Sequence, residues 1–283
     1  MDDLVFHNGR IIPLSEARLS PGQMGLLLGW GVFTTLRIYA GRAFAFDRHW
    51  ARMSHDAARL GMDLGHDEAS VRQTVSRLAE ANDRREGMAR VSFVKNRGGL
   101  WAQAGERPET DLLIFTRELV QWPAIHRLKV QPHALYSATR LAGAKMLSWA
   151  QNAALLEQAH AEGFDDVLLL NESGHLAECT SANVFLVRDN TVMTPPLSAG
   201  CLPGVTRDVL LEIVPRADFE LCEQDLTPRD LDSAAEVFIS STTREVAAVG
   251  SIHPDWRYPA PGKVTAVIEV AFKEYVRSHL KSC

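Results

Sequence analysis

The chain has 283 residues, of which 46% are hydrophobic, and its formal net charge is −5. This length can bury the core of one large domain or of two ordinary ones, and the composition is that of a globular protein rather than of a disordered chain. Because the net charge is negative and no run of Lys and Arg reaches three, a nucleic-acid-binding surface is not expected.

The sequence also argues against membrane, secreted and metal-binding classes. The longest apolar runs, such as Val167–Leu170, are far too short to span a bilayer. The first residues, Met1-Asp2-Asp3, lack the basic start and the apolar stretch of a signal peptide. The cysteines have no CxxC spacing and the histidines are scattered, so we expect reduced thiols, a cytoplasmic location and no metal site. The cysteines are Cys179, Cys201, Cys222 and Cys283.

The first part of the chain predicts short strands and two helices. Asn8-Gly9 and Ala40-Gly41 are typical hairpin turns. The helices are expected to begin after an N-cap at Asp47 and at about Glu68, the second one ending near Asn82. The strands are expected at Leu4–His7, Arg10–Pro13, Phe33–Tyr39, Arg42–Phe46, about Ala89–Lys95 and about Asp111–Arg117.

The second part mixes strands with longer helices. Helices are expected at about Trp149–Glu162, from the favourable first-turn Pro203 to about Val214, and at about Lys263–Leu280. The expected strands are Leu128–His133, Asp165–Leu170, Asn183–Val187, Thr191–Thr194, Glu236–Ser240 and Glu245–Val249. This pattern predicts an α+β fold with an N-terminal domain over residues 1–118, a linker over 119–125 and a larger C-terminal domain over 126–283.

Lys145 is the most informative single residue. It lies among small and apolar residues in Leu141-Ala142-Gly143-Ala144-Lys145-Met146-Leu147. Burial removes the hydration of a lysine and disfavours its ammonium form. A neutral amine can react with an aldehyde, which makes lysine the usual anchor for pyridoxal phosphate. The alternative is an ordinary solvent-exposed lysine.

Glu178 supplies a second group that such a cofactor needs. A carboxylate beside the pyridine nitrogen keeps that nitrogen protonated, and the protonated ring withdraws electrons from the substrate's Cα. The alternative is an exposed glutamate at the end of a strand.

Three further segments have the composition of anion sites. Leu202–Asp208 opens a helix, whose free N–H groups and dipole suit a phosphate, and Gly204 permits close approach. Ser240–Thr243 offers hydroxyls after a strand, and His49-x-x-Arg52 places a cation on a helix, where it could form a bidentate pair with phosphate. The alternatives are a plain helix start, a polar turn and a solvated arginine, so the argument depends on the joint occurrence and the order of all these features.

Taken together, these motifs resemble the class IV, fold-type IV pyridoxal-phosphate enzymes, which include branched-chain and D-amino-acid aminotransferases and aminodeoxychorismate lyases. The resemblance runs from Gly29-Trp30-Gly31-Val32-Phe33-Thr34-Thr35-Leu36-Arg37 to the Ser240–Thr243 segment. It implies a small N-terminal α/β domain, a larger C-terminal α/β domain, the cofactor between them, and homodimers whose loops share active sites.

The same resemblance assigns roles to individual residues. Lys145 would hold the cofactor covalently, Glu178 would face its ring nitrogen, and Asn183 would orient the site. The phosphate would be bound by Arg52, Val205, Thr206 and Thr242, with Ser241 close by. The residues expected to meet the substrate are Arg97, Phe33, Arg37 and Thr243. For Arg37 the alternative is a structural role, since it lies in an alternating strand and could point to solvent.

The branch within the family is less sharply marked. The segments around Phe33 and Lys145 are similar to those of aminodeoxychorismate lyases, while Arg97 lies in an Arg-Gly loop that lyases share with D-amino-acid aminotransferases. Two departures are Ser148, where those enzymes usually have Asn, and Phe33, where D-amino-acid enzymes usually have Tyr. The leading hypothesis is a transaminase that exchanges an amino group between an amino acid or amine and a 2-oxoacid. The alternatives are a lyase forming 4-aminobenzoate and pyruvate, and a member without turnover.

Overall fold

The computed structural model describes residues 1–96 and 109–282, and their contacts divide the chain into two compact units. The first unit comprises Met1–Val120 together with Ala144–Trp149, and the second comprises Gln121–Gly143 together with Ala150–Cys283. The boundary between the units lies after Val120, and the segment with Lys145 belongs to the first unit. The domain limits and the linker at residues 119–125 stay a prediction from the sequence.

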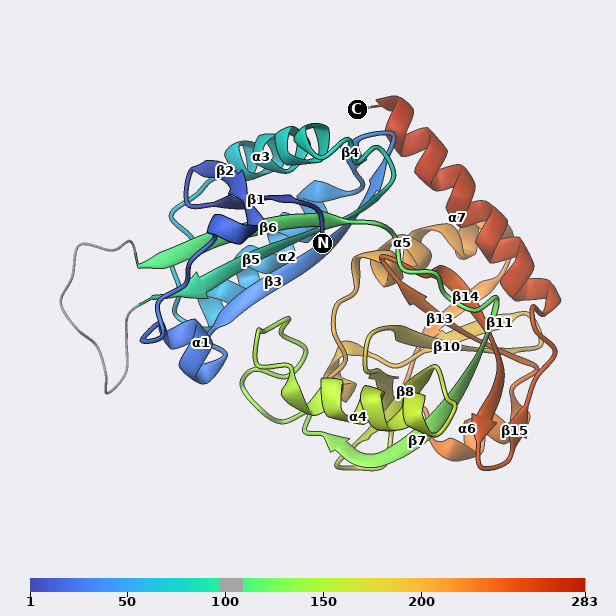
Figure 1. Cartoon of the computed structure of the whole chain (residues 1–283). Coiled ribbons are helices and arrows are strands. Elements are labelled where there is room, and N and C mark those ends of the chain that lie inside the picture. Colours follow the sequence, from blue (N-terminus) through green and yellow to red (C-terminus); the bar gives the residue numbers. More distant parts are fainter. Residues whose placement is uncertain (97–108, 283) are drawn as a thin grey trace. The chain divides into compact units, whose positions relative to one another are not determined.

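The first unit is built on an antiparallel sheet, six-stranded within the described residues, in the order β2-β1-β6-β5-β3-β4 (Figure 1). Hairpins and long antiparallel neighbours account for this order, since β3, β5 and β6 pair over nearly their full lengths. The elements are β1 Leu4–His7, β2 Arg10–Pro13, α1 Met24–Leu28, β3 Gly31–Tyr39, β4 Arg42–Ala43, α2 Phe46–Arg59, α3 Glu68–Ala81, β5 Gly87–Lys95 and β6 Thr110–Arg117.

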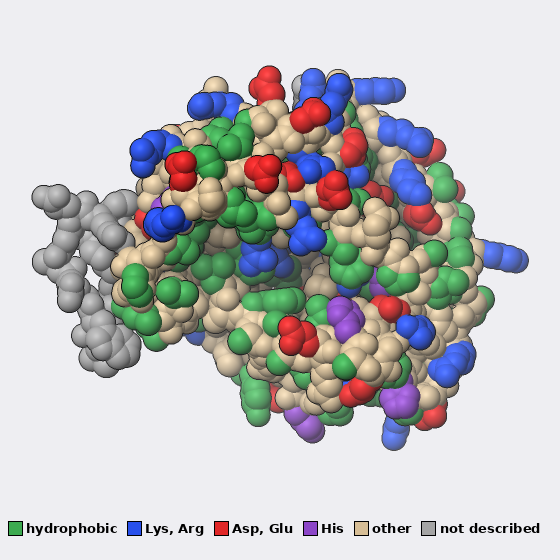
Figure 2. Space-filling view, viewed as in Figure 1, with side chains coloured by type: hydrophobic (Ala, Val, Ile, Leu, Met, Phe, Trp, Pro, Cys, Tyr) green, Lys and Arg blue, Asp and Glu red, His purple; other side chains and the backbone are tan. Residues whose placement is uncertain are grey.

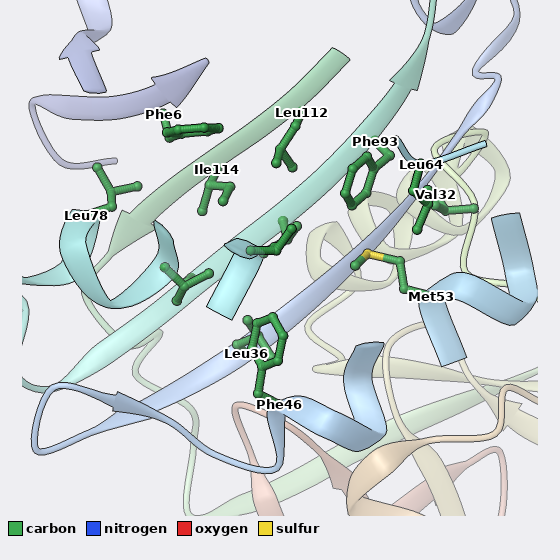
Figure 3. Packing of buried hydrophobic residues seen from close by; sticks show 14 of the residues in the cluster. Phe6, Val32, Leu36, Phe46, Met53, Leu64, Leu78, Phe93, Leu112 and Ile114 are labelled. Carbon is green, nitrogen blue, oxygen red and sulfur yellow. The ribbon is translucent and has the colours of Figure 1, made fainter. Parts of the chain in front are cut away.

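Helices α2 and α3 bury their apolar sides on one face of this sheet (Figure 3). Phe46 and Met53 of α2 meet alternate residues of β3, among them Leu36, and Phe93 of β5 lies in the same cluster. Each such side chain contributes roughly 1.5–3 kcal/mol when it is fully buried. Because β3 alternates its side chains between two faces, this core leaves Phe33 on the opposite face.

The start of α2 differs from the prediction. The N-cap is Ala45, in the left-handed conformation with φ 48°, and Asp47 lies inside the first turn. Strand β4 ends at Ala43, so the expected strand Arg42–Phe46 is too long. The apolar residue Phe46 is buried at 2% exposure, and its packing sets the start of the helix in place of a polar cap.

The second unit is built on a mixed sheet, in which the described strands have the order β12-β11-β10-β13-β14-β7-β8-β9 and β15 pairs with β14. The pairs β7/β8, β7/β14 and β11/β12 are parallel. The strands are β7 Ile125–Leu135, β8 Asp166–Asn171, β9 Leu176–Cys179, β10 Asn183–Arg188, β11 Thr191–Thr194, β12 Glu220–Glu223, β13 Glu236–Ser241, β14 Glu245–His253 and β15 Trp256–Arg257.

Helices cover this sheet and fix its central strands. Helix α7 packs on β13 and β14, α5 packs on β13 and on α7, and α4 packs on β8. The rings of Phe185 in β10 and Phe238 in β13 stack with their centroids 4.8 Å apart in the interior. The helices are α4 Ala150–Ala161, α5 Val205–Ile213, α6 Pro228–Ser233 and α7 Lys263–Ser282. Short 3-10 turns in the described part of the chain are Leu14–Glu16, Leu197–Ala199 and Pro215–Ala217.

The α+β class predicted from the sequence is confirmed by this mixture of helices and sheets. Acidic and basic side chains are interspersed on the visible face (Figure 2), in keeping with the modest net charge of −5. Among the described helices, none combines the length and the apolarity needed to cross a membrane.

Candidate active site

The backbone of Lys145 is fixed from two sides within the first unit. Its carbonyl accepts the N–H of Phe33 in β3 at 3.1 Å, and its own N–H donates to Oδ2 of Asp56 in α2 at 3.1 Å. Met146 forms an antiparallel bridge with Val32, which extends β3 by a short piece of distant chain. The lysine segment is thus held against the sheet and against a helix residue that lies 89 positions earlier in the sequence.

Gly31 makes this close approach possible. A Cβ built on Gly31 would lie 2.4 Å from both Phe93 O and Leu147 Cδ1. No side chain fits at this position, because the Phe93 carbonyl belongs to the backbone of the neighbouring strand β5 and real Cβ contacts are essentially never shorter than 3.0 Å. The second glycine of the Gly29-Trp30-Gly31 motif is therefore explained mainly by the close approach of the β5 backbone, with the end of the Leu147 side chain packed against the same position.

The amine of Lys145 lies beside the ring of Phe33, with Nζ 4.7 Å from the ring centroid. Arg90 of β5 contacts the same ring, its Cζ lying 3.6 Å from the centroid. Burial lowers the pKa of the Arg90 guanidinium. Within residues 1–96 and 109–282, no carboxylate lies within ion-pair distance of Arg90. The amine of Lys145 and the guanidinium of Arg90 thus both contact one aromatic ring, and Arg90 has no anionic partner in the described chain.

Arg90 was missed by the sequence reasoning. In the β3/β5 register Phe33 pairs with Ser92, which places Arg90 diagonally across from Phe33 on the same face. The signal was present as a charged residue between the apolar Ala89 and Val91, but its meaning depends on a strand register that the sequence alone does not give.

A polar cluster lies on the opposite side of β3. Arg52 Nη2 donates to Oγ1 of Thr34 at 2.9 Å, and that hydroxyl lies 2.7 Å from Nδ1 of His49. Burial, together with the charges of Arg52 and Lys145, holds the pKa of His49 well below its ordinary value. Neutral His49 can accept at Nδ1, so the Thr34 hydroxyl accepts from Arg52 and donates to His49. These contacts fix the direction of the Arg52 side chain.

In the second unit, Glu178 of β9 is held by groups that approach a single carboxylate oxygen. Its Oε2 accepts the N–H of Leu202 at 3.1 Å and, at the long distance of 3.4 Å, Nδ2 of Asn183. Asn183 also donates to the carbonyl of Leu202 at 2.9 Å. Glu178, Asn183 and the loop before α5 therefore form one group of hydrogen bonds, which fixes the plane and the direction of the carboxylate.

Helix α5 begins directly after this loop. Gly204 is its N-cap and provides no side-chain cap, so the N–H groups of its first turn have no partner within the helix. The first residues, Val205 and Thr206, are nevertheless buried. A Cβ on Gly204 would lie 2.0 Å from Oδ1 of Asn183. Pro203 precedes the N-cap, so the prediction that it occupies the first turn was wrong.

The turn after β13 carries hydroxyls fixed by neighbours in the same unit. Ser241 Oγ accepts the N–H of Arg244 at 3.2 Å, and Thr243 Oγ1 accepts Nε1–H of Trp122 at 3.3 Å. Ser240 is 1% exposed, and its hydroxyl finds no hydrogen-bond partner among the described residues. A buried hydroxyl without a partner and a buried helix start without a cap are two features that a bound phosphate would satisfy.

The remaining expected residues fall outside these groups. The guanidinium of Arg37 donates to the carbonyl of Gly87 at 2.9 Å and pairs with Glu86 at 2.9 Å, which gives it a structural role within the first unit. Arg97 lies outside the described residues. Thr242 lies in the turn between β13 and β14, half-buried.

Comparison with known proteins decides the family. The family model described as amino-transferase class IV matches residues 31–252. The chain belongs to the class IV aminotransferases. It is 30% identical over 284 aligned positions to the D-alanine aminotransferase of Bacillus licheniformis, covering 97% of both chains.

Solved structures show the same fold for this class IV aminotransferase. The branched-chain aminotransferase of the archaeon Thermoproteus uzoniensis is 23% identical, with a TM-score of 0.90 over 100% of this chain and 97% of that one. The branched-chain aminotransferase of Escherichia coli is 22% identical, with a TM-score of 0.89 over 98% and 95%. The family resemblance and the transaminase hypothesis are thus confirmed, and class IV aminotransferases depend on pyridoxal phosphate.

Proposed function

We propose that this aminotransferase binds pyridoxal phosphate covalently through Lys145 and transfers an amino group between an amino acid and a 2-oxoacid. When bound, the cofactor supplies an aldehyde carbon and a pyridine ring that withdraws electrons from the substrate's Cα. The observation that carries the proposal is the fixed backbone of Lys145, which Phe33 and Asp56 hold from two sides.

Lys145 is the residue proposed to move protons. Its Nζ, placed beside Phe33, would accept the proton from Cα of the bound substrate as a general base and hold it for return as a general acid. A fixed peptide on both sides of the lysine limits the directions that the amine can take, so most of the positioning is complete before substrate binds.

Glu178 is proposed to face the ring nitrogen and to keep it protonated. Its Oε2 is held by Leu202 and Asn183, so the direction of the carboxylate is set by neighbours in its own unit. Asn183 would therefore act on the cofactor through Glu178 and through the loop that begins α5.

The cofactor's phosphate is proposed to be bound by a guanidinium, by backbone N–H groups and by hydroxyls, as the family resemblance implies. Arg52 offers a guanidinium already oriented by Thr34, and the first turn of α5 offers the N–H groups of Val205 and Thr206. The hydroxyls of the Ser240–Thr243 turn complete the proposed set, with Ser241 and Thr242 among them.

The substrate would be recognised by its carboxylate and its apolar part. Arg90 offers a half-buried cation beside the Phe33 ring, so we expect a carboxylate to bind there and apolar atoms to contact Phe33. Thr243 and Arg97 remain predicted substrate contacts. A homodimer with shared active sites and a cytoplasmic location also remain proposals, carried over from the family resemblance.

The test begins with purified protein. We expect visible absorbance from bound cofactor, its loss in Lys145→Ala, and borohydride trapping of the cofactor on the peptide that contains Lys145. Lys263→Ala, which removes an exposed lysine at the start of α7, serves as the control and should behave like the wild type. Trapping on another lysine, or an unchanged spectrum in Lys145→Ala, would contradict the proposal.

Substrate assays then separate the reaction types. Amino donors of both the L and the D configuration are mixed with the cofactor-loaded enzyme. The loss of visible absorbance and the amount of 2-oxoacid formed are measured. Formation of 4-aminobenzoate from aminodeoxychorismate without amino transfer to any 2-oxoacid would replace the transaminase proposal by a lyase.

A further inference from the structure

We propose that Asp56 is a positioning residue for Lys145, acting as a built-in hydrogen-bond acceptor for the lysine's own backbone. The inference rests on the proposed function, because it concerns the lysine expected to bind the cofactor. Asp56 lies on α2, it is 1% exposed, and its Oδ2 accepts the backbone N–H of Lys145 at 3.1 Å.

The contact completes the fixation of one peptide group on each side of the lysine. The carbonyl of Lys145 is occupied by the N–H of Phe33, while the N–H is occupied by Asp56. The first bond ties the segment to β3 and the second ties it to α2, so rotation of the segment about the strand would break the bond to the helix. Asp56 is therefore the contact that sets the angle at which the lysine leaves its backbone.

Asp56 shares one stripe of α2 with two other polar residues. His49, Arg52 and Asp56 follow one another at intervals of three and four residues, the spacing that places side chains on one side of a helix. His49 and Arg52 contact the hydroxyl of Thr34 on β3, and Asp56 contacts the lysine segment paired to the same strand. A polar stripe thus runs along a helix whose neighbouring stripe, with Met53 and Ala57, packs in the hydrophobic core.

Burying the Asp56 carboxylate costs free energy of folding, so its presence calls for a role that an apolar residue could not fill. Burial raises the pKa of Asp56, and Nη1 of Arg59 lies 3.7 Å from Oδ1. Among the described residues no hydrogen-bond donor reaches Oδ1. The hydrogen bond from Lys145 opposes the effect of burial on this pKa, so the cost of burial is offset in part by the contact that positions the lysine.

The experiment compares three substitutions in the cofactor-loaded enzyme. Asp56→Ala removes the acceptor, Asp56→Asn keeps an acceptor oxygen without the charge, and Asp56→Glu keeps the charge but displaces the oxygen by one methylene. The rate of a single turnover is measured at saturating amino donor, together with KM, cofactor content and circular dichroism. Asp47→Ala removes an exposed carboxylate from the same helix and is the matched control.

We expect Asp56→Ala and Asp56→Glu to lower the single-turnover rate about 10- to 100-fold with little change in KM, since a displacement of about 1 Å can have that effect. Asp56→Asn should stay within about threefold of the wild type, and Asp47→Ala should be unchanged. A loaded Asp56→Ala or Asp56→Glu enzyme with wild-type turnover overturns the inference, as does an Asp56→Asn enzyme as slow as Asp56→Glu. If Asp56→Ala does not fold, the Asn and Glu variants decide alone.

Borohydride trapping separates this inference from the proposed function. If the wild type traps cofactor on Lys145 while the Asp56 variants turn over normally, only the positioning role of Asp56 fails. If the wild type itself traps no cofactor on Lys145, the proposed function is wrong, and the positioning role of Asp56 is wrong with it.

Discussion

Protonation of His126 is expected to destabilise the second unit between pH 6.5 and about pH 4. His126 is fully buried, and its Nε2 accepts Nε–H of Arg244 at 3.2 Å. The guanidinium of Arg244 also stacks on the ring of Trp122, 3.6 Å from its centroid, and pairs with Asp166 at 3.0 Å. A proton on Nε2 would face the guanidinium and remove this hydrogen bond.

The magnitude of the expected loss of stability follows from the difference between the pKa of His126 in the folded and the unfolded chain. Burial, and then the charge of Arg244, lower the pKa of His126 from 6.5 to about 4, while the carboxylates of Asp165 and Asp166 oppose the change. Each pKa unit corresponds to about 1.36 kcal/mol, so the difference amounts to at most about 3 kcal/mol. Because the unfolded chain binds the proton first, this stability is complete above pH 6.5 and is lost as the pH falls toward 4.

The assay is urea unfolding at several pH values between about 7 and 4, with circular dichroism as the signal that monitors unfolding. His126→Gln keeps an amide oxygen that can accept from Arg244 but does not titrate in this range. The wild type should lose up to about 3 kcal/mol relative to His126→Gln on acidification, while His160→Gln, at an exposed position of α4, should follow the wild type. Parallel stability curves for the wild type and His126→Gln would refute the reasoning.

Three further outcomes are expected. Gly204→Ala places a Cβ 2.0 Å from Oδ1 of Asn183, so titration of the apoenzyme with pyridoxal phosphate should show weaker binding; unchanged affinity would remove the role given to this loop. Arg90→Gln should raise KM for amino acids roughly 10- to 100-fold, since a hydrogen bond to a charged group contributes about 1.5–3 kcal/mol, and should leave KM for amines without a carboxylate unchanged; an equal effect on both would exclude carboxylate recognition. Asp166→Ala leaves Arg244 buried without its carboxylate, and urea unfolding should show a loss of about 3–5 kcal/mol; a loss below about 1 kcal/mol would show that the ion pair contributes little.

Much of the fold was predictable because local signals and burial agree. The hairpin turns at Asn8-Gly9 and Ala40-Gly41 connect β1 to β2 and β3 to β4 as expected. Helix α3 runs from Glu68 to Ala81, close to the predicted range, because an N-cap at Asp67 and a regular apolar spacing point to the same start. The short elements β9, β12 and α6 were not predicted, since four to six residues carry little periodicity of their own. Strands β1 and β2 are equally short, but the Asn8-Gly9 turn between them marks both.

The residues of the candidate site also differ in how far the sequence alone points to them. Glu178, Asn183 and Gly204 could be singled out because each lies in a short sequence motif. The residue types of these motifs indicate a ring-nitrogen partner or a phosphate site. Arg90 and Asp56 were not singled out, because the meaning of each depends on partners 57 and 89 residues away in the sequence, Phe33 and Lys145. Strand register and the docking of residues 144–149 are tertiary facts, and no local pattern reports them.

Lys145 and Glu178 belong to different units, so substitutions near each of them should have separate effects on turnover and on cofactor affinity. In the first unit, the backbone of Lys145 is fixed by contacts with β3 and α2, and in the second unit Glu178 is fixed by contacts with the loop before α5. Since each group is held by hydrogen bonds within its own unit, a change at Asp56 should alter turnover while cofactor affinity stays nearly constant. A change at Gly204 should do the reverse. Arg52 is proposed to bind phosphate, and it also contacts Thr34 of β3. Its replacement should therefore lower cofactor affinity, and through Thr34 and His49 it should also disturb the helix that positions the lysine.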